Sequence, residues 1–324
     1  MSSDERRGTA AVVEAHALPR RLWLTALVIG VVVLLVAAFI TEITDDTILV
    51  PNVIMVGSFL VPVCTVLFIL SRPRVTHLTV EVLVLGFLAG GTAGVVLTAV
   101  TEVYLLPDHV ATNAVIGLIE EGGKILLLLA VATLVSVRVP RDGMVLGATV
   151  GAGFAAFETS GYVLRVLIEH SDDHAILNIL ETEAFRGVLS PFGHITWTAL
   201  LGGAVFASAW YTGRFRLDRR VFWTLVGVIS LHGFWDASYG WAIRATHWIG
   251  GEGLDLGWPN TADWIGSPTN EELTRFTVAY DVLLGVLSVI GLVWAIRTWR
   301  TYELNRWSST HPRAGAAPAA HAIA

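Results

Sequence analysis

The chain has 324 residues, of which 54% are apolar and 15% are charged, whereas about a quarter of the residues in an ordinary soluble domain are charged. This composition excludes a cytosolic globular enzyme and predicts an integral membrane protein, because only lipid solvates so much apolar side chain outside a core. The single cysteine, Cys64, excludes an intrachain disulfide and a cysteine-based metal site, and the net charge of −6 argues against a nucleic-acid partner.

Apolar stretches of about 20 residues recur along the chain, which is the length that an α-helix needs to cross a bilayer. We therefore predict an all-α fold, a polytopic transmembrane bundle of eight helices. The fourth, fifth and seventh stretches contain ionisable residues, so their assignment uses length and flanking sequence together. The predicted spans lie at residues 22–40, 49–70, 79–100, 112–135, 143–168, 186–210, 221–244 and 276–296.

Arginine clusters indicate the orientation of the bundle. They precede the first span and follow the second, fourth, sixth and eighth, so that 16 of the 21 basic residues lie on one side. Because cytoplasmic connections collect Lys and Arg, we predict a multi-pass protein of the cell membrane with both termini in the cytoplasm. Residues 1–21 and 301–324 are expected to be cytoplasmic tails, the second disordered, around a bundle at 22–300. The abundance of Ala, Val, Gly and Arg, with one lysine, is typical of a bacterial source.

Glycines recur within the third and fifth spans at spacings that let helix backbones approach closely. No strand precedes them, so the run Gly-Ala-Gly at 151–153 is not expected to be a nucleotide-binding loop. We expect close helix packing at these positions instead. The glycines are Gly86, Gly90, Gly91 and Gly94 in the third span and Gly147, Gly151 and Gly153 in the fifth.

Ionisable side chains stand inside four of the predicted spans, where each costs a few kcal/mol on insertion scales. Counting along each helix at about 1.5 Å per residue places five of them about 12–18 Å below the outer surface. A shared depth indicates one polar cavity in the outer half of the bundle. Arg186, at the outer boundary of the sixth span, is instead expected to extend toward lipid headgroups. The five residues are Glu120, Glu158, His194, His232 and Asp236.

The spacing of residues along the helices adds Glu121 and Lys124 to the groups expected in the polar cavity. Glu120 and Glu121 lie four and three residues before Lys124, so one ammonium can reach both carboxylates. Asp236 follows His232 by four residues and can orient its imidazole. The cluster thus contains a general base, a cation that keeps a carboxylate ionised, and two imidazoles able to stabilise an oxyanion or bind a metal. A buried ion-pair cluster that only fixes helix packing remains the alternative.

Four ordered motifs resemble those of the PrsW family of intramembrane proteases, which is related to the CAAX prenyl protease superfamily. They read Glu-Glu-Gly-Gly-Lys at 120–124, Gly-Ala-Gly-Phe-Ala-Ala-Phe-Glu at 151–158, His-Ile-Thr-Trp-Thr-Ala at 194–199 and His-Gly-Phe-Trp-Asp at 232–236. The resemblance covers residues 112–240. It implies an active site formed by Glu120, Glu121, Glu158, His194 and His232, with Lys124 completing the first motif. Asp236, which the spacing to His232 makes a supporting residue, stands where members of the family commonly have Asn. Thr159 stands where members of the family often have Asn.

The favoured function is an intramembrane endopeptidase that cleaves a membrane-bound protein in the bilayer with water activated by glutamate and histidine. The substrate class implied by the resemblance is a membrane regulator such as an anti-sigma factor. The reaction would use either no cofactor or a divalent metal such as zinc, with Glu158, His194 and His232 as its ligands. A proton-coupled membrane transporter and a non-catalytic membrane scaffold remain as alternatives, because acid and histidine layers also mark ion pathways.

Overall fold

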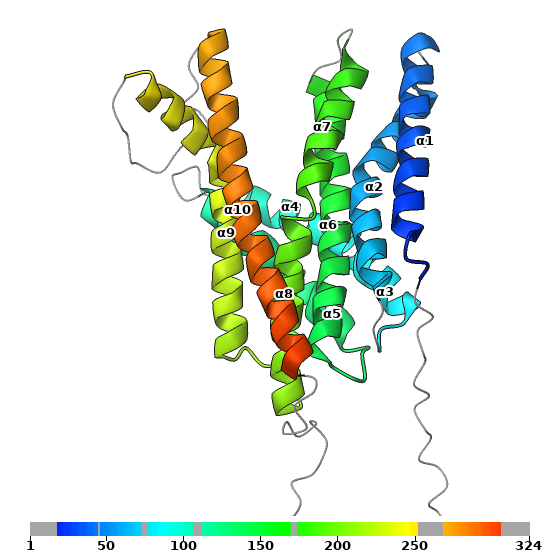
Figure 1. The fold of residues 1–324 in the computed structure, drawn as a ribbon, viewed down its shortest axis with the longest axis vertical. Coiled ribbons are helices and arrows are strands. Elements are labelled where there is room, and N and C mark those ends of the chain that lie inside the picture. The colour runs from blue at the N-terminus through cyan, green and yellow to red at the C-terminus, as the bar shows by residue number, and fades with distance from the viewer. Residues whose placement is uncertain are drawn as a thin grey trace, which may run out of the picture.

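A computed structural model describes residues 18–44, 46–72, 77–105, 112–169, 174–251 and 268–305. Within these ranges every regular element is a helix, and the helices form one elongated bundle (Figure 1). Most of the two predicted tails, residues 1–17 and 306–324, lies outside the described residues. The helix at the C-terminal end continues to Asn305, a few residues beyond the predicted boundary at 300.

The helices follow one another along the chain, and residues 252–267, between the last two helices, lie outside the described ranges. A short 3₁₀ turn, Thr47–Leu49, precedes the second helix, and a π-helical segment, η2 (Ala89–Gly94), joins the third and fourth. The helices are α1 (Leu22–Thr44), α2 (Val50–Leu70), α3 (Val80–Leu88), α4 (Val95–Leu105), α5 (Thr112–Ala132), α6 (Pro140–Glu169), α7 (Ala175–Leu189), α8 (His194–Thr212), α9 (Arg219–Ile249) and α10 (Asn270–Asn305).

Five helical stretches in the described ranges are long and apolar enough to cross a membrane. The all-α transmembrane bundle is therefore confirmed in outline, while the count of eight spans and the cytoplasmic termini stay predictions. The helices α5, α6 and α9 do not reach this measure, and these are the helices that carry Glu120, Glu158 and His232. The five stretches are Leu22–Thr44, Thr47–Leu70, Val80–Tyr104, Ala175–Trp210 and Asn270–Tyr302.

The predicted sixth span, 186–210, is interrupted. The chain leaves α7 after Leu189 and enters α8 at His194, because Pro191 has no backbone N–H to continue the helix. The hydroxyl of Thr196 donates to the carbonyl of Pro191 at 2.6 Å and so satisfies one group freed by the break. Irregular backbone at membrane depth is tolerated where protein buries it. The break makes His194 the first residue of α8.

Helix α6 lies in the middle of the bundle, with α9 and α10 on one side and α1 and α2 on the other (Figure 1). Its glycines meet the backbone of α8: a Cβ atom on Gly147 would stand 2.1 Å from the carbonyl oxygen of Thr198, and one on Gly151 would stand 2.3 Å from that of His194. Its opposite face meets α3, where a Cβ on Gly153 would stand 1.9 Å from the carbonyl oxygen of Phe87. The prediction of close packing at these glycines is confirmed.

Candidate functional site

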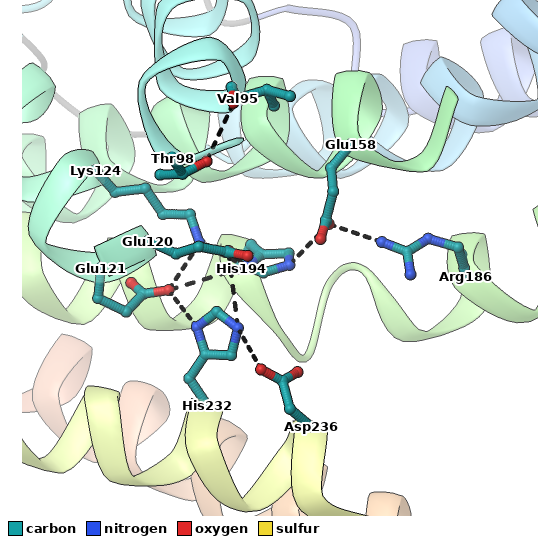
Figure 2. A network of polar contacts seen from close by, with 10 residues as sticks. All are labelled: Val95, Thr98, Glu120, Glu121, Lys124, Glu158, Arg186, His194, His232 and Asp236. Carbon is teal, nitrogen blue, oxygen red and sulfur yellow. Dashed lines mark hydrogen bonds and ion pairs between the residues drawn. The ribbon is translucent and has the colours of Figure 1, made fainter. Parts of the chain in front are cut away.

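Seven polar residues from four helices meet at one place inside the bundle (Figure 2). Helix α5 supplies two carboxylates and an ammonium, and α6, α8 and α9 surround them with further acids and imidazoles. Every residue that the sequence placed in the predicted cavity belongs to this polar cluster. Its members are Glu120, Glu121, Lys124, Glu158, His194, His232 and Asp236.

Lys124 stands at the centre of the polar cluster and is fully buried. Its ammonium donates to Glu120 Oε2 at 3.0 Å and to Glu121 Oε1 at 2.8 Å, and it lies 2.8 Å from His194 Nδ1. An ammonium has three donors and no acceptor, so His194 Nδ1 must be the acceptor in this contact. The ring proton of neutral His194 is therefore on Nε2, which lies 3.0 Å from Glu158 Oε2.

The two carboxylates of α5 have different surroundings. Glu121 is fully buried, and its Oε1 accepts from Lys124 and lies 2.9 Å from His232 Nδ1. Its Oε2 is buried without a hydrogen-bond partner among the described residues. Glu120 retains 8% exposure of its side chain and is held on one oxygen by Lys124. Glu121 is thus anchored deep in the cluster, and Glu120 is the carboxylate nearer to its open side.

Glu158 is held by an arginine that sequence reasoning assigned elsewhere. Arg186 Nη2 donates to Glu158 Oε2 at 2.7 Å, its Nε donates to Thr159 Oγ1 at 3.1 Å, and its guanidinium lies 4.0 Å from the centre of the Tyr162 ring. The prediction that Arg186 extends toward lipid headgroups is therefore wrong. Its signal in the sequence was a cation at the start of a predicted span, and its pairing with Glu158 depends on how α7 packs against α6.

Aromatic rings close the polar cluster on the side of α6 and α8. The ammonium of Lys124 lies 3.8 Å from the centre of the Phe154 ring, and the centres of the Trp197 and His232 rings are 4.8 Å apart. Phe154 and Trp197 are each 1% exposed. These rings exclude water from one side of the cluster, which strengthens the electrostatic interactions inside it.

Four members of the polar cluster could hold a metal ion. Glu120, Glu121, His194 and His232 each offer one ligand atom, and these atoms lie within 4.8 Å of one another. Imidazole nitrogens and carboxylate oxygens are ligands that zinc takes in proteins, and the unpartnered Oε2 of Glu121 has lone pairs to give. These residues therefore have the chemical types that bind zinc. A metal ion on His194 Nδ1 would have to displace the ammonium of Lys124, which contacts the same atom.

Glu158 is not part of this group of four, although the sequence interpretation included it as a ligand with His194 and His232. Its carboxylate oxygen Oε2 is occupied by Arg186 at 2.7 Å and by His194 Nε2 at 3.0 Å. Asp236 likewise stands beside the cluster, with its Oδ2 3.4 Å from His232 Nε2. Both carboxylates contact the imidazoles from the outside.

Comparison with known proteins gives one finding. The sequence model of the PrsW family of intramembrane metalloproteases matches residues 75–251, which is more than half of the chain. The matched segment runs from the residues before α3 to the end of α9 and contains the whole polar cluster. No curated protein and no solved structure matches the chain.

Proposed function

Because the chain belongs to the PrsW family of intramembrane metalloproteases, we propose that the polar cluster is its active site and that it hydrolyses a peptide bond of a membrane-bound protein. Family membership makes the protein an intramembrane protease, so the proposal concerns the site, the mechanism and the substrate. The observation that carries it is the convergence of Glu120, Glu121, His194 and His232 within 4.8 Å in the matched segment.

Three residues would hold the metal: Glu121, His194 and His232. Catalytic zinc sites keep three protein ligands and one open position, and two histidines with a glutamate is a known set. We assign Glu121 rather than Glu120 because Glu121 is fully buried and has an unpartnered oxygen. When bound, the ion would act as a Lewis acid on the scissile carbonyl and acidify water.

Glu120 is the general base in this proposal. It lies beside the proposed ligands, it is the more exposed of the paired carboxylates, and Lys124 holds one of its oxygens at 3.0 Å. The carboxylate can take a proton from the attacking water. The protonated carboxyl of Glu120 can then pass this proton to the departing amine.

Glu158 and Arg186 are positioning residues. Glu158 Oε2 accepts a hydrogen bond from the Nε2–H of His194, so that the Nδ1 atom of His194 faces the centre of the cluster. Carboxylates that accept from a ligating histidine fix its tautomer and ring orientation in many metal sites. Arg186 neutralises the charge of Glu158. Asp236 lies beside His232 as Glu158 lies beside His194, and it would orient the His232 ring in the same way.

We propose that the substrate is a single-span protein of a bacterial cell membrane. It would be an anti-sigma factor or another membrane-bound regulator. The supporting observations are the buried position of the site and the apolar helices around it. The test is incubation of the purified protein in liposomes with a panel of tagged single-span proteins, followed by mass spectrometry of the products. A defined cut within a span supports the proposal; proton flux in the same liposomes without any cut would favour a transporter.

We expect the purified protein to contain about one zinc ion per chain, measured by inductively coupled plasma mass spectrometry. Replacing His194 or His232 by alanine removes a proposed ligand and should abolish zinc retention after dialysis. Glu158→Gln is the matched variant, because it changes a carboxylate that touches His194 from outside the group of four. It should retain zinc with affinity about 10–100-fold lower. Equal loss of zinc in all three variants would instead place Glu158 among the ligands.

Replacing Arg186 by glutamine should lower kcat by about 10–100-fold and leave KM nearly unchanged, since the change acts through Glu158 and His194 rather than on the substrate. Steady-state cleavage kinetics check this. Arg165→Gln is the control, because Arg165 pairs with Glu169 on an exposed part of the same bundle. Arg186→Lys should restore part of the rate. Full activity of Arg186→Gln would show that Glu158 needs no counter-charge.

A further inference from the structure

A cavity away from the polar cluster lies between the beginning of α9 and the end of α10. It has a volume of about 590 Å³ and is lined by Asp218, Arg219, Arg220, Trp223, Thr224 and Trp294. A neighbouring cavity of about 280 Å³ shares three of these residues and adds Arg297 and Thr298 from α10. We call the two together the α9–α10 pocket.

The charge of the α9–α10 pocket is positive. Arg219, Arg220 and Arg297 line it with three guanidinium groups, and Thr224 and Thr298 add hydroxyl donors. The one acidic residue, Asp218, accepts from the backbone N–H of Val221 at 2.9 Å and so caps the first turn of α9. Arginine presents planar, paired donors that match phosphate oxygens. The polar part of the pocket therefore suits an anionic phosphate group.

The surroundings of the α9–α10 pocket are apolar. Trp223 and Trp294 form part of its wall, and Trp223 is 58% exposed. From the same ends of the two helices, large apolar side chains point outward along the bundle, among them Phe222 on α9 and Val293 and Ile296 on α10. A free phosphate ion would use only the arginines. A ligand with both a phosphate and long apolar chains would use the arginines and these faces together.

The position of the α9–α10 pocket fits such a ligand. The arginines stand in the first turn of α9 and the last turns of α10, at the end of the bundle where α10 finishes (Figure 1). Basic pockets between helices at a membrane boundary bind lipid headgroups. We propose that the α9–α10 pocket binds the phosphate of an anionic phospholipid, whose acyl chains lie along the exposed apolar faces of α9 and α10.

The bound lipid would join helices that hold the polar cluster. His232 follows Arg219 by 13 residues on α9, which is about 20 Å along the helix. Between these two points α9 packs tightly on α10: a Cβ atom added to Gly227 would stand only 2.8 Å from the Trp294 ring. A phospholipid that links the ends of α9 and α10 would therefore stabilise the helix pair that positions His232. The inference does not depend on the catalytic roles proposed above.

The test compares thermal unfolding in nanodiscs of phosphatidylcholine alone with nanodiscs that also contain phosphatidylglycerol. We expect the anionic lipid to raise the unfolding midpoint by several degrees. The triple variant Arg219→Gln, Arg220→Gln, Arg297→Gln should lose this rise. The matched control, Arg214→Gln, Arg216→Gln, Arg300→Gln, removes the same charge from arginines that do not line the pocket, and it should keep the rise. Native mass spectrometry should find one retained phosphatidylglycerol in the wild type.

Each other outcome overturns the proposal. If the triple variant keeps the rise, the pocket does not bind the lipid. An equal loss in the control variant would mean that the arginines attract anionic lipid only as general surface charge. If inorganic phosphate added to phosphatidylcholine nanodiscs gives the same rise, the ligand is a free anion and not a phospholipid. Should the triple variant fail to fold, Arg297→Gln alone is measured by native mass spectrometry, where loss of the retained lipid supports the proposal and its retention overturns it.

Discussion

Replacing Glu120 by glutamine is expected to lower the rate of substrate cleavage by about 10²–10⁴-fold, the usual contribution of a general base. The amide keeps the size of the side chain and an oxygen for the Lys124 ammonium, which lies 3.0 Å from Glu120 Oε2. It cannot take a proton from water. The measurement is the single-turnover cleavage rate of a tagged single-span substrate in liposomes, with protein folding checked by thermal unfolding.

The neighbouring carboxylate provides the sharpest comparison. Glu121→Gln should also abolish cleavage, but together with loss of bound zinc, because we assign Glu121 as a ligand and Glu120 as the base. Glu120→Gln should keep its zinc. Glu169→Gln, which changes an exposed acid paired with Arg165, should leave both properties unchanged. If Glu120→Gln loses its zinc while Glu121→Gln retains zinc and still fails to cleave, the two assignments must be exchanged.

Replacing Gly147 by valine should destabilise the bundle by about 3 kcal/mol, at the upper end of the usual cost of overpacking. The new Cβ would stand 2.1 Å from the carbonyl oxygen of Thr198 and 2.8 Å from its carbon. These are backbone atoms of α8, so no side chain can rotate away, and α6 and α8 must separate. We expect the apparent unfolding temperature in detergent to fall by about 5–10 °C.

Gly161→Val is the matched control for this prediction. Gly161 lies on the same helix, α6, but a Cβ there would meet no atom within 4 Å. The control shares the change in helix propensity from glycine to valine, so the difference between the two variants measures the contact with α8. Similar unfolding temperatures for both variants would mean that α6 and α8 are not packed backbone to backbone. Because His194 opens α8, separation of the helices should also lower the cleavage rate.

The composition of the polar cluster could be predicted from the sequence because it follows from helix geometry. The spacing of Glu120, Glu121 and Lys124 fixes which side chains share a face, and the rise per residue gives the depth of His194 and His232. Neither argument needs to know how the helices are arranged. The spacing of the glycines of α6 likewise predicted close packing, although it did not say which helices they would meet.

Other parts of the site depend on packing between distant segments. Arg186 lies on α7 and Glu158 on α6, so their ion pair depends on how these two helices pack against each other, which helix geometry alone does not give. The different burial of Glu120 and Glu121 depends on how α5 is rotated against its neighbours. The α9–α10 pocket likewise combines Arg219 and Arg297, which lie far apart along the chain.

Lys124 gives the protein an unusual chemical property. It is the only lysine in the sequence, and its ammonium is fully buried beneath Phe154 with three acceptors around it. An amine-reactive reagent therefore has a single side-chain target, which it can reach only when the helices around the polar cluster move apart. The rate of acylation at Lys124, followed by peptide mapping, would thus report how often the interior opens, and a substrate that holds it open should speed the labelling.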